Sequence, residues 1–243
     1  MEKYLIYNLE MNSLADGKEP RDVFCILSVI TTGNVPWSYY HVRSGHVPQT
    51  RYEQTLKTIQ TIRDKVPDVF IVLIECSDIS QEMTDTLCSK VDHFVQAYTN
   101  EPVRKVCIDG SAKGHGETVQ SLLAIEAIKT LTFPIRRIFK ISGRYYLNHF
   151  FDLDKFSLTE YTFNKKNFND TGGYHTVLYS VPFCLFENFE KVFRECEAVY
   201  QYDCAHFEGL FPPKCIPQTR IDCVGVEGCP ASTNEVWSPG PGW

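Results

Sequence analysis

The segment Lys140-Ile141-Ser142-Gly143-Arg144-Tyr145 has the residue types and the order expected where a strand meets a ligand. It continues an apolar stretch of strand length, so its Ser-Gly-Arg triplet falls at the carboxyl end of a predicted strand. Gly143 would let the backbone approach a ligand, and the planar fork of Arg144 suits the oxygens of a diphosphate. The alternative is a plain strand end whose arginine pairs with a surface carboxylate.

Two further segments carry positive charge near predicted helix starts. Arg43-Ser44 and Arg51 lie between the first apolar strand and a helix, whose free N–H groups favour a phosphate or an anionic sugar. Lys113-Gly114-His115-Gly116-Glu117 is a glycine-punctuated loop before another helix, where glycines allow close backbone approach. Its spacing matches neither a Walker motif nor a dinucleotide-binding fingerprint. The alternative for both segments is a solvated loop followed by a capped helix.

Carboxylates occur at two places where nucleotide contact or proton transfer is chemically reasonable. Glu75, followed by Ser77, ends the second predicted strand and could accept from the imide N–H or the ribose of a nucleotide; a helix-capping turn is the alternative. The segment Asp203-Cys204-Ala205-His206-Phe207-Glu208 gathers several proton-transferring groups. A general base would suit a partly buried carboxylate with a raised pKa. Within this segment we prefer Glu208 to Asp203, and an ordinary surface helix is the alternative.

Two groups of residues are weak candidates for metal binding. Asp152-Leu153-Asp154 has the DxD spacing by which many sugar transferases hold Mn²⁺ or Mg²⁺, but it lies beyond the strand end, in a predicted surface turn. Four of the ten cysteines form a C-terminal cluster without the CxxC pair that zinc sites usually show: Cys204, Cys215, Cys223 and Cys229. Three others sit in or beside apolar runs and are predicted to be buried thiols: Cys25, Cys76 and Cys107.

Strands and helices alternate through the part of the chain that carries these segments. Apolar runs predict strands over 23–30, 69–75, 93–98 and 136–141. Helices are predicted between them: one after a capping-box pair of Thr50 and Glu53, one from Ser80, and one after the glycine-punctuated loop. This order predicts a three-layer α/β/α sandwich with a mainly parallel sheet. Ligands bind such sheets outside the carboxyl ends of the strands, where the candidate segments fall.

Length and composition favour one folded domain over residues 1–243. We expect a nucleotide-binding half from about 20 to 156 and an acceptor-binding half with a wrapping tail from about 157 to 243. A hydrophobic content of 43% excludes global disorder, and a net charge of −6 argues against a general nucleic-acid binder. No signal peptide or membrane-spanning stretch is recognisable, so we expect a cytoplasmic protein with reduced cysteines.

The order and content of these segments resemble a GT-A glycosyltransferase. The shared features are a first strand and helix, a second strand ending Glu-Cys-Ser, a Gly-His-Gly-Glu helix start and a strand ending at the DxD position. The stretch from Phe24 to Phe156 is similar to small glycosyltransferase-like proteins of large DNA viruses that infect algae. The matching residues are Arg51, Gln54, Thr55, Thr58, Ile62, Pro67, Glu75, Ser77, Gly116, Glu117, Lys140, Ser142, Gly143, Arg144 and Tyr145.

The resemblance implies transfer of a sugar from a nucleoside diphosphate sugar to a hydroxyl of a glycan or glycoprotein acceptor, a viral capsid glycan included. Uridine is the expected base, and a pentose such as xylose is a candidate sugar. The donor-binding residues are expected to be Ser28, Thr31, Arg43, Arg51, Glu75, Ser77, Lys113, Gly114, His115, Gly116, Ser142, Gly143 and Arg144. Glu208, or else Asp203, would deprotonate the acceptor in an inverting displacement. The expected acceptor-binding residues are Tyr145, Tyr174, His206 and Phe207.

One departure from the family pattern concerns the metal. Ser142-Gly143-Arg144 stands where the metal-binding DxD would be, so Arg144, Arg43 or Lys113 could neutralise the diphosphate instead of Mn²⁺ or Mg²⁺. Two other interpretations stay open. A sugar nucleotidyltransferase should carry a glycine-rich loop with Arg and Lys directly after its first strand. A non-catalytic sugar-binding module with a degenerate GT-A fold is favoured by the missing DxD.

Overall fold

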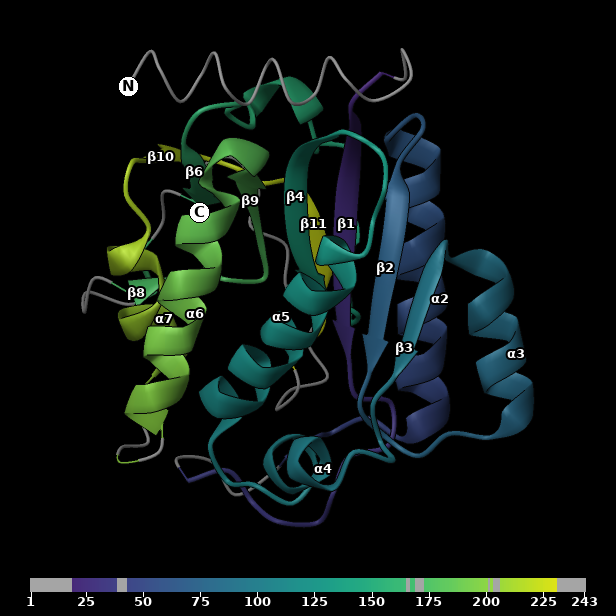
Figure 1. Cartoon of the computed structure of the whole chain (residues 1–243). Helices are drawn as coiled ribbons and strands as arrows, with labels where there is room; N and C mark the ends of the chain where they lie inside the picture. Colours follow the sequence, from purple (N-terminus) through teal and green to yellow (C-terminus); the bar gives the residue numbers. More distant parts are fainter. Residues whose placement is uncertain are drawn as a thin grey trace.

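A central sheet of seven strands organises the computed structural model, which describes residues 19–38, 43–164, 167–168, 173–200, 202 and 206–230. The strand order is β10-β6-β9-β4-β1-β2-β3 (Figure 1). The strands are β1 (Arg21–Ser28), β2 (Phe70–Glu75), β3 (His93–Gln96), β4 (Ile135–Ser142), β6 (Tyr161–Asn164), β9 (Leu178–Pro182) and β10 (Gln218–Ile221). Neighbours in this order are parallel except where β9 pairs with β4 and β6. The predicted mainly parallel sheet is therefore confirmed.

Helices cover both faces of this sheet. They are α2 (Pro48–Lys65), α3 (Gln81–Lys90), α4 (Glu101–Cys107), α5 (Lys113–Lys129), α6 (Phe186–Tyr200) and α7 (Phe207–Leu210). Helices α5 and α6 lie against one face and α2 and α3 against the other, with a buried hydrophobic cluster on each side (Figure 1). Two small sheets join β5 (Tyr145–Leu147) to β11 (Val226–Gly228) and β7 (Asn167–Phe168) to β8 (Gly173–Tyr174). The three-layer α/β/α sandwich is as predicted.

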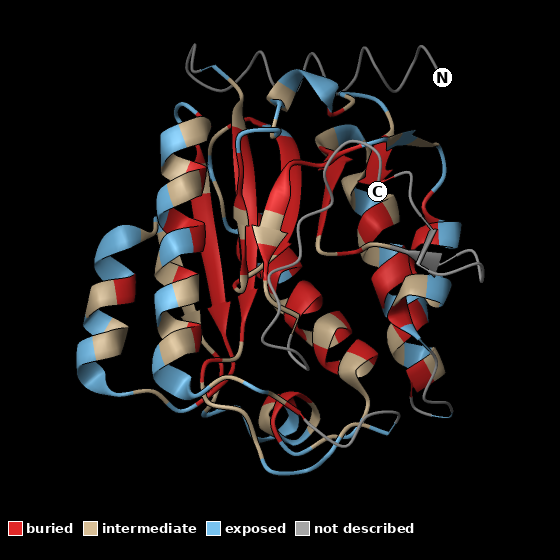
Figure 2. Ribbon diagram, turned by 180° about the vertical axis from the view of Figure 1, so that it is seen from behind, coloured by how far each residue is buried: buried red, intermediate tan, exposed pale blue. Residues whose placement is uncertain are grey.

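The apolar run of β1 follows from this double cover. Val23, Cys25 and Leu27 face the cluster beneath α5 and α6. Phe24 and Ile26 face the cluster beneath α2. All five are at most 5% exposed, because successive strand residues point to opposite faces and both faces are covered. Figure 2 shows the same pattern for the sheet, with buried strands inside and helices that are buried only along their inner sides.

The strand order contains a switch point between β1 and β4. From β1 the chain proceeds to β2 and then β3 on one side, whereas β4 adds to the other side of β1. Connections that leave in opposite directions open a crevice at the carboxyl ends of the two strands where the order reverses. These ends lie at the bottom of Figure 1, close to α4 and to the start of α5. The topology therefore places a ligand site at this edge.

Two local predictions are wrong, and one helix has no counterpart in the predicted elements. Helix α2 begins at Pro48 after Val47, without a side-chain cap, so Thr50 and Glu53 form no capping box. Proline suits this first helical position because its missing N–H would have no partner there. Helix α4 was not predicted, although Asn100 caps it by accepting a hydrogen bond from the N–H of Val103 at 3.4 Å.

Helix α5 begins at Lys113, so the glycine-punctuated segment is helical rather than a loop. Gly114 is required by close helix packing, because a Cβ there would lie 2.1 Å from the hydroxyl oxygen of Tyr200 in α6. Helix propensity argued against glycines in a first turn, but this packing of α5 on α6 overrides it.

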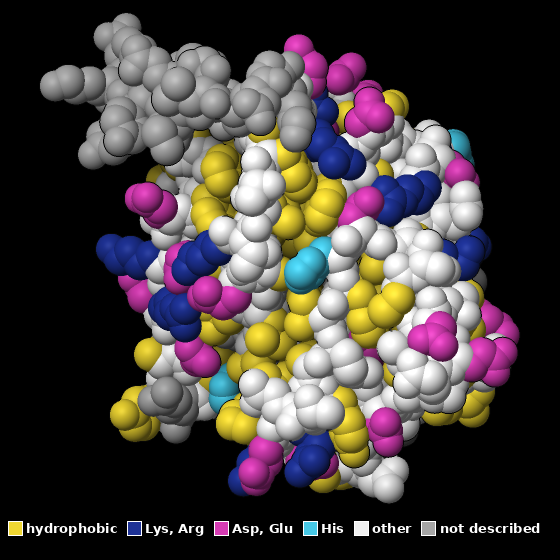
Figure 3. Space-filling model, turned by 45° about the vertical axis from the view of Figure 1, so that its right-hand side comes forward, with side chains coloured by type: hydrophobic (Ala, Val, Ile, Leu, Met, Phe, Trp, Pro, Cys, Tyr) yellow, Lys and Arg dark blue, Asp and Glu magenta, His cyan; other side chains and the backbone are white. Residues whose placement is uncertain are grey.

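The surface mixes charges of both signs. On the face shown in Figure 3, basic side chains lie beside acidic ones rather than in one basic field. Ion pairs at the surface, such as Lys129–Glu190 at 2.7 Å, also place opposite charges next to each other. Within the described ranges, no helix combines the length and the apolar character needed to cross a bilayer. The predicted burial of Cys25, Cys76 and Cys107 is confirmed, since all three are at most 3% exposed.

Candidate functional site

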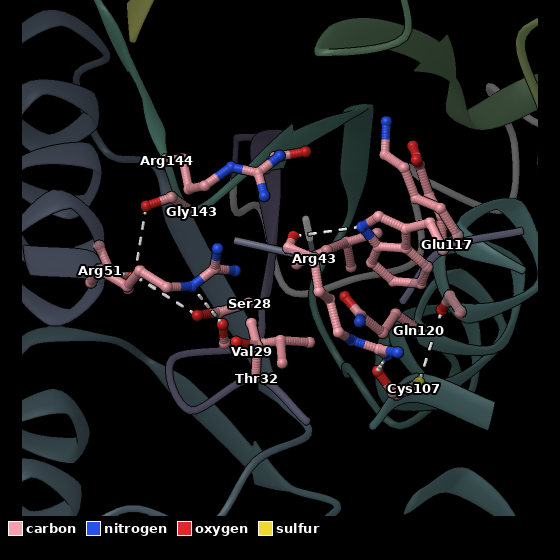
Figure 4. A pocket seen from close by; sticks show the side chains of 16 residues that line it. Ser28, Val29, Thr32, Arg43, Arg51, Cys107, Glu117, Gln120, Gly143 and Arg144 are labelled. Atoms are coloured by element: carbon pink, nitrogen blue, oxygen red, sulfur yellow. Dashed lines mark hydrogen bonds between the residues drawn. The ribbon is translucent and has the colours of Figure 1, made fainter. Parts of the chain in front are cut away.

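A cleft opens at the carboxyl edge of the sheet, between the ends of β1 and β4 (Figure 4). It encloses about 730 Å³, its open mouth included. Residues from β1, the loop after β1, α2, α5 and the turn after β4 form its walls. The structure brings many of the predicted donor-binding residues together here: Ser28, Arg43, Arg51, Lys113, Gly116, Ser142, Gly143 and Arg144. The switch point and the predicted phosphate-binding side chains therefore coincide.

The turn after β4 is held against β1 and α2. The N–H of Gly143 donates to the carbonyl of Leu27 at 2.9 Å, and the carbonyl of Gly143 accepts from the Thr55 hydroxyl at 3.2 Å. One helical turn further, the Thr58 hydroxyl donates to the carbonyl of Tyr145 at 2.8 Å. A Cβ at position 143 would lie 3.0 Å from the Thr55 oxygen, so a larger residue would crowd this contact. These contacts fix the backbone on both sides of Arg144, whose side chain reaches across the cleft (Figure 4).

Arg51 and Arg144 bring two positive charges into the same part of the cleft. Arg51 is 6% exposed, and its Nε donates to the carbonyl of Val29 at 2.7 Å. Burial, and then the nearby charge of Arg144, lower the pKa of Arg51, while Glu75 offsets part of this effect. The Nε of Arg144 is buried and meets no hydrogen-bond acceptor among the described residues. An anion bound here would relieve the repulsion between the two guanidinium groups.

Arg43 lines the cleft, but its terminal nitrogens bind carbonyl groups of the protein. Its two terminal nitrogens donate to the carbonyls of Val35 at 3.0 Å, Gly110 at 2.6 Å and Cys107 at 2.7 Å. The guanidinium group therefore ties the loop after β1 to α4 and the segment that follows it. The ring of Trp37 lies over this group at 4.0 Å, and its Nε1 donates to the Arg43 carbonyl at 3.2 Å. Arg43 adds positive charge to the cleft, but these donors already have partners in the protein.

Two lysines and two glutamates form a charge network on the α5 side. Lys140 is buried and donates to a carboxylate oxygen of Glu117 and to the carbonyl of Thr176 at 2.8 Å. Burial lowers the pKa of Lys140, and Glu117 opposes this effect. The Lys113 ammonium, which lines the cleft, lies 3.6 Å from a Glu208 carboxylate oxygen. Burial alone would raise the pKa of Glu208, but Lys113, with Lys140, lowers it overall. The predicted raised pKa is thus wrong, and Glu208 is ionised at neutral pH.

Glu75 and Ser77 lie behind the cleft wall. The Glu75 carboxylate is fully buried and accepts from the N–H of Ile30 at 3.2 Å and from the N–H of Ser77 at 2.8 Å. The Ser77 hydroxyl in turn accepts from the N–H of Thr31 at 2.8 Å. This network connects the loops after β1 and β2. We therefore assign Thr31, Glu75 and Ser77 to the support of the cleft rather than to contact with a base or ribose.

Gly114 and His115 face α6 instead of the cleft. The His115 ring stacks on Tyr200 with centroids 5.4 Å apart, and burial lowers the pKa of His115. Both residues follow the first position of α5 and lie on the side of the helix that packs against α6. Their predicted contact with the diphosphate does not follow from this placement.

Two predicted acceptor-binding rings belong to the hydrophobic core. Tyr145 is 4% exposed and lies in the cluster beneath α2. Phe207 is 2% exposed and stacks on Phe211 with centroids 5.0 Å apart. Neither ring presents an open face to an acceptor, which corrects the prediction. His206 is exposed at the start of α7. The prediction for Asp203, and that for the side chain of Tyr174, lie outside the described residues.

Asp152 and Asp154 lie at the opposite end of the strands. Asp152 accepts from the N–H of Asp154 at 3.1 Å in a short exposed turn. The carbonyl of Leu153 in this turn accepts from Arg137, near the start of β4, at 3.0 Å. At the carboxyl end, the DxD position holds serine, glycine and arginine. Nowhere among the described residues do three histidine, cysteine, aspartate or glutamate side chains gather as metal ligands. The described residues at the carboxyl edge therefore offer no set of ligands that fits a divalent cation.

Trp37 and Gln120 line the cleft without having been predicted, and Glu117 was named in the 113–117 segment but not among the expected donor-binding residues. For two of them a signal existed. Positions 113, 116, 117 and 120 follow the i, i+3, i+4, i+7 spacing of one helix face, and all four residues line the cleft. The glycines of this segment favour a loop, and they conceal the helical spacing of these four positions. For Trp37 the local sequence offered no comparable pattern.

Comparisons with known proteins add structural likeness only. No protein-family model and no curated protein matches the chain. The glycosyltransferase GlyE of Streptococcus pneumoniae TIGR4 is similar at 7% identity and a TM-score of 0.47, over 84% of this chain and 46% of that one. This chain thus spans less than half of the length of GlyE. A glycosyltransferase involved in the glycosylation of the major capsid of PBCV-1 is similar at 12% identity and a TM-score of 0.39, over 84% and 83% of the two chains. Mouse xyloside xylosyltransferase 1 is similar at 9% identity and 0.41, over 84% and 86%.

Proposed function

We propose that the chain is a glycosyltransferase that moves a sugar from a nucleoside diphosphate sugar to a hydroxyl of a glycan acceptor. The observation that carries this proposal is the meeting of Arg51, Arg144 and Lys113 in a cleft at the switch point of a mainly parallel sheet. Such crevices are where open α/β sheets bind nucleotides. The cations supply the countercharge that a diphosphate needs. The sequence resemblance to GT-A enzymes supports the same activity.

The diphosphate lies between Arg144 and Lys113 in this proposal, with Arg51 adding charge from behind. When the bond to the sugar breaks, negative charge grows on the diphosphate oxygen. Cations that are already fixed in place stabilise that charge without reorganising. Arg144 and Lys113 therefore take the role that a metal ion has in DxD enzymes, and we expect transfer without a metal.

The reaction is a single displacement. The oxygen of an acceptor hydroxyl attacks the anomeric carbon, the bond from that carbon to the diphosphate breaks, and the hydroxyl proton passes to a carboxylate. We assign the proton to Glu208, which Lys113 keeps ionised, and retain Asp203 as the alternative. Attack from the face opposite the diphosphate inverts the anomeric configuration. From the resemblance, a uridine-linked pentose such as xylose and a viral capsid glycan are the first donor and acceptor to test.

A thermal-shift screen of nucleoside diphosphates and their sugars, each with EDTA and with Mn²⁺, tests this proposal. Ligand at a hundred times its Kd stabilises the folded state by about 2.7 kcal/mol. For a chain of this size that raises Tm by about 5–10 °C. We expect such a shift for one base, in EDTA as well as in Mn²⁺. The absence of a shift with every nucleotide would contradict the proposal, and a strict Mn²⁺ requirement would contradict its metal-free form.

Turnover then separates the open alternatives. A transferase slowly releases sugar from the selected donor to water, whereas a sugar-binding module leaves the donor intact. A nucleotidyltransferase would instead form pyrophosphate from a sugar phosphate and a nucleoside triphosphate. Release of free sugar together with nucleoside diphosphate, measured by chromatography, is the expected result.

A further inference from the structure

Glu117 differs in charge from the other ionised side chains that line the cleft. Among the described lining residues it is the one carboxylate, and the remaining charged groups are Arg43, Arg51, Lys113 and Arg144. It lies in the second turn of α5, across the cleft from Arg51 and Arg144 (Figure 4). A carboxylate repels phosphate, so the part of the cleft beside Glu117 suits a different part of a ligand from the part between Arg144 and Lys113.

Lys140 holds this carboxylate in place. The side chains of Lys140 and Glu117 are 3% and 12% exposed, and one carboxylate oxygen, Oε1, accepts from the buried ammonium. Rotation of Glu117 away from the pair would leave the ammonium buried without its anion, which is strongly unfavourable. The carbonyl of Thr176 fixes the ammonium from another side at 2.8 Å. The Glu117 carboxylate is therefore positioned before any ligand binds.

The second oxygen, Oε2, is available to a ligand. No described protein group donates a hydrogen bond to it, and the residue lines the cleft. Gln120 lies less than one turn further along α5, lines the same wall and is 7% exposed. A carboxylate oxygen accepts from hydroxyl groups more strongly than a neutral oxygen does, and its lone pairs can serve two neighbouring hydroxyls. The part of this wall at Glu117 and Gln120 fits a neutral group rich in hydroxyls, whereas a phosphate fits the space between Arg144 and Lys113.

We infer that Glu117 selects the transferred sugar by accepting hydrogen bonds from its hydroxyls, and that Lys140 is the positioning residue that fixes Glu117 for this contact. The inference rests on the proposed function, because it takes the ligand to be a nucleoside diphosphate sugar. With the diphosphate between Arg144 and Lys113, the sugar extends toward the α5 wall. The negative charge of Glu117 then separates the hydroxyl-bearing sugar from the phosphates and sets the direction of the donor.

Calorimetric titration of wild type and Glu117→Gln with three ligands tests this inference. The ligands are the nucleoside diphosphate chosen by the thermal screen, its sugar conjugate, and deoxy-sugar conjugates that each lack one hydroxyl. In wild type, loss of the contacted hydroxyl is expected to weaken binding by about tenfold, the value of one charge-assisted hydrogen bond. In Glu117→Gln the intact and deoxy donors should bind within about twofold of each other, and the affinity for the nucleoside diphosphate alone should be unchanged.

Two further variants control for folding. Glu117→Gln leaves Lys140 without its anion, so the double variant Glu117→Gln with Lys140→Met removes both charges and should regain a cooperative melt. It should show the same loss of discrimination between intact and deoxy donors. Glu126→Gln makes the same chemical change at an exposed position of α5, where Glu126 pairs with Lys129 and Arg194. This variant should discriminate as wild type does.

Each contrary outcome has a distinct meaning. If Glu117→Gln still discriminates between intact and deoxy donors, the inference is overturned. It is overturned equally if kcat falls while every donor Kd stays constant, because Glu117 would then act as the proton acceptor. If wild type binds the nucleoside diphosphate but does not distinguish the intact sugar conjugate from the deoxy conjugates, the inference fails. The proposed nucleotide site is then unaffected. If no nucleotide binds wild type, the proposed function itself fails and the inference with it.

Discussion

The two ends of β1 and β4 both gather arginines, but their surroundings differ. At the amino end, Arg136 and Arg137 bind the buried carboxylate of Asp22, with N–O distances of 2.5 Å and 3.0 Å. At the carboxyl end, Arg51 and Arg144 face the cleft, and the carboxylate that acts on the pKa of Arg51 belongs to Glu75, behind the wall. In the first cluster, a carboxylate of the protein itself lies against the two arginines. The second has no ion pair with a carboxylate among the described residues, and in our proposal a bound diphosphate supplies the missing negative charge.

The pKa shifts of the two clusters express this difference. Burial alone would raise the pKa of Asp22, but hydrogen bonds from Arg137 and then Arg136 lower it overall. The ionised form is thus favoured at the amino end. At the carboxyl end, burial and the charge of Arg144 lower the pKa of Arg51, so the ionised form is disfavoured there. Arg136 and Arg137 have a carboxylate partner, whereas Arg51 and Arg144 form no ion pair with a described carboxylate, which is the charge pattern that our proposal uses for an anionic ligand.

Removal of Asp22 should have the largest effect on stability. Asp22→Asn leaves Arg136 and the buried Arg137 without their anion, which should lower the free energy of unfolding by about 3–5 kcal/mol. Urea titration measures this loss. Asp85→Asn, at an exposed position of α3, is the matched control and should change the free energy by less than about 0.5 kcal/mol. A loss below about 1 kcal/mol for Asp22→Asn would show that the two arginines find other partners and would weaken the comparison.

Removal of Arg144 should affect activity instead of stability. Arg144→Ala takes one cation from the growing charge of the diphosphate, so kcat/KM should fall about a hundredfold, equivalent to about 2.7 kcal/mol. The free energy of unfolding should stay constant or rise, since repulsion with Arg51 is removed. Steady-state kinetics and urea titration on the same preparation check both parts. Arg194→Ala on the exposed side of α6 is the control, and a destabilised Arg144→Ala with normal kinetics would invert our assignment of the two ends.

Acid should weaken the amino-end cluster. The folded-state pKa of Asp22 is below its ordinary value of 3.8, so its contribution is fully present above that value. The contribution is lost as pH falls through the lower folded-state pKa, because the unfolded chain then binds the proton first. The difference in unfolding free energy between wild type and Asp22→Asn should therefore be constant from pH 7 to pH 5 and shrink below about pH 4. A difference that grows on acidification would show that this ion pair is not formed.

The smallest effect is expected at the DxD sequence. Asp152→Asn and Asp154→Asn change exposed side chains in a turn at the amino end, so stability should change by less than about 0.5 kcal/mol. Transfer activity, with or without EDTA, should equal that of wild type. A strong loss of activity in either variant would show that this turn reaches the reacting groups, and the contrast between the two ends would no longer hold.

The layered fold could be predicted from the sequence because its strands are covered on both faces. Every position of such a strand is apolar, as in Phe24-Cys25-Ile26-Leu27, and that pattern needs no knowledge of the partners. Helix starts were harder to predict, because a cap depends on a few local atoms. Asn100 before α4 is a typical capping residue. With only seven residues, however, α4 is too short to show a helical periodicity of apolar residues. The start of α5 was obscured by Gly114, whose place depends on Tyr200 in another helix.

By itself, the sequence determined that Arg144 follows the carboxyl end of one strand and that Arg51 follows that of another. Parallel strands share their direction, so both arginines had to reach the same edge of the sheet. Only the tertiary structure decided which charges have partners. Asp22 and Arg137 are 115 positions apart, and Glu117 and Lys140 are 23 apart, so neither ion pair leaves a local pattern. Pairing depends on which side chains the packed layers bring into contact. Those contacts give Asp22 its arginines and Glu117 its lysine, whereas Arg51 and Arg144 form no ion pair with a described carboxylate.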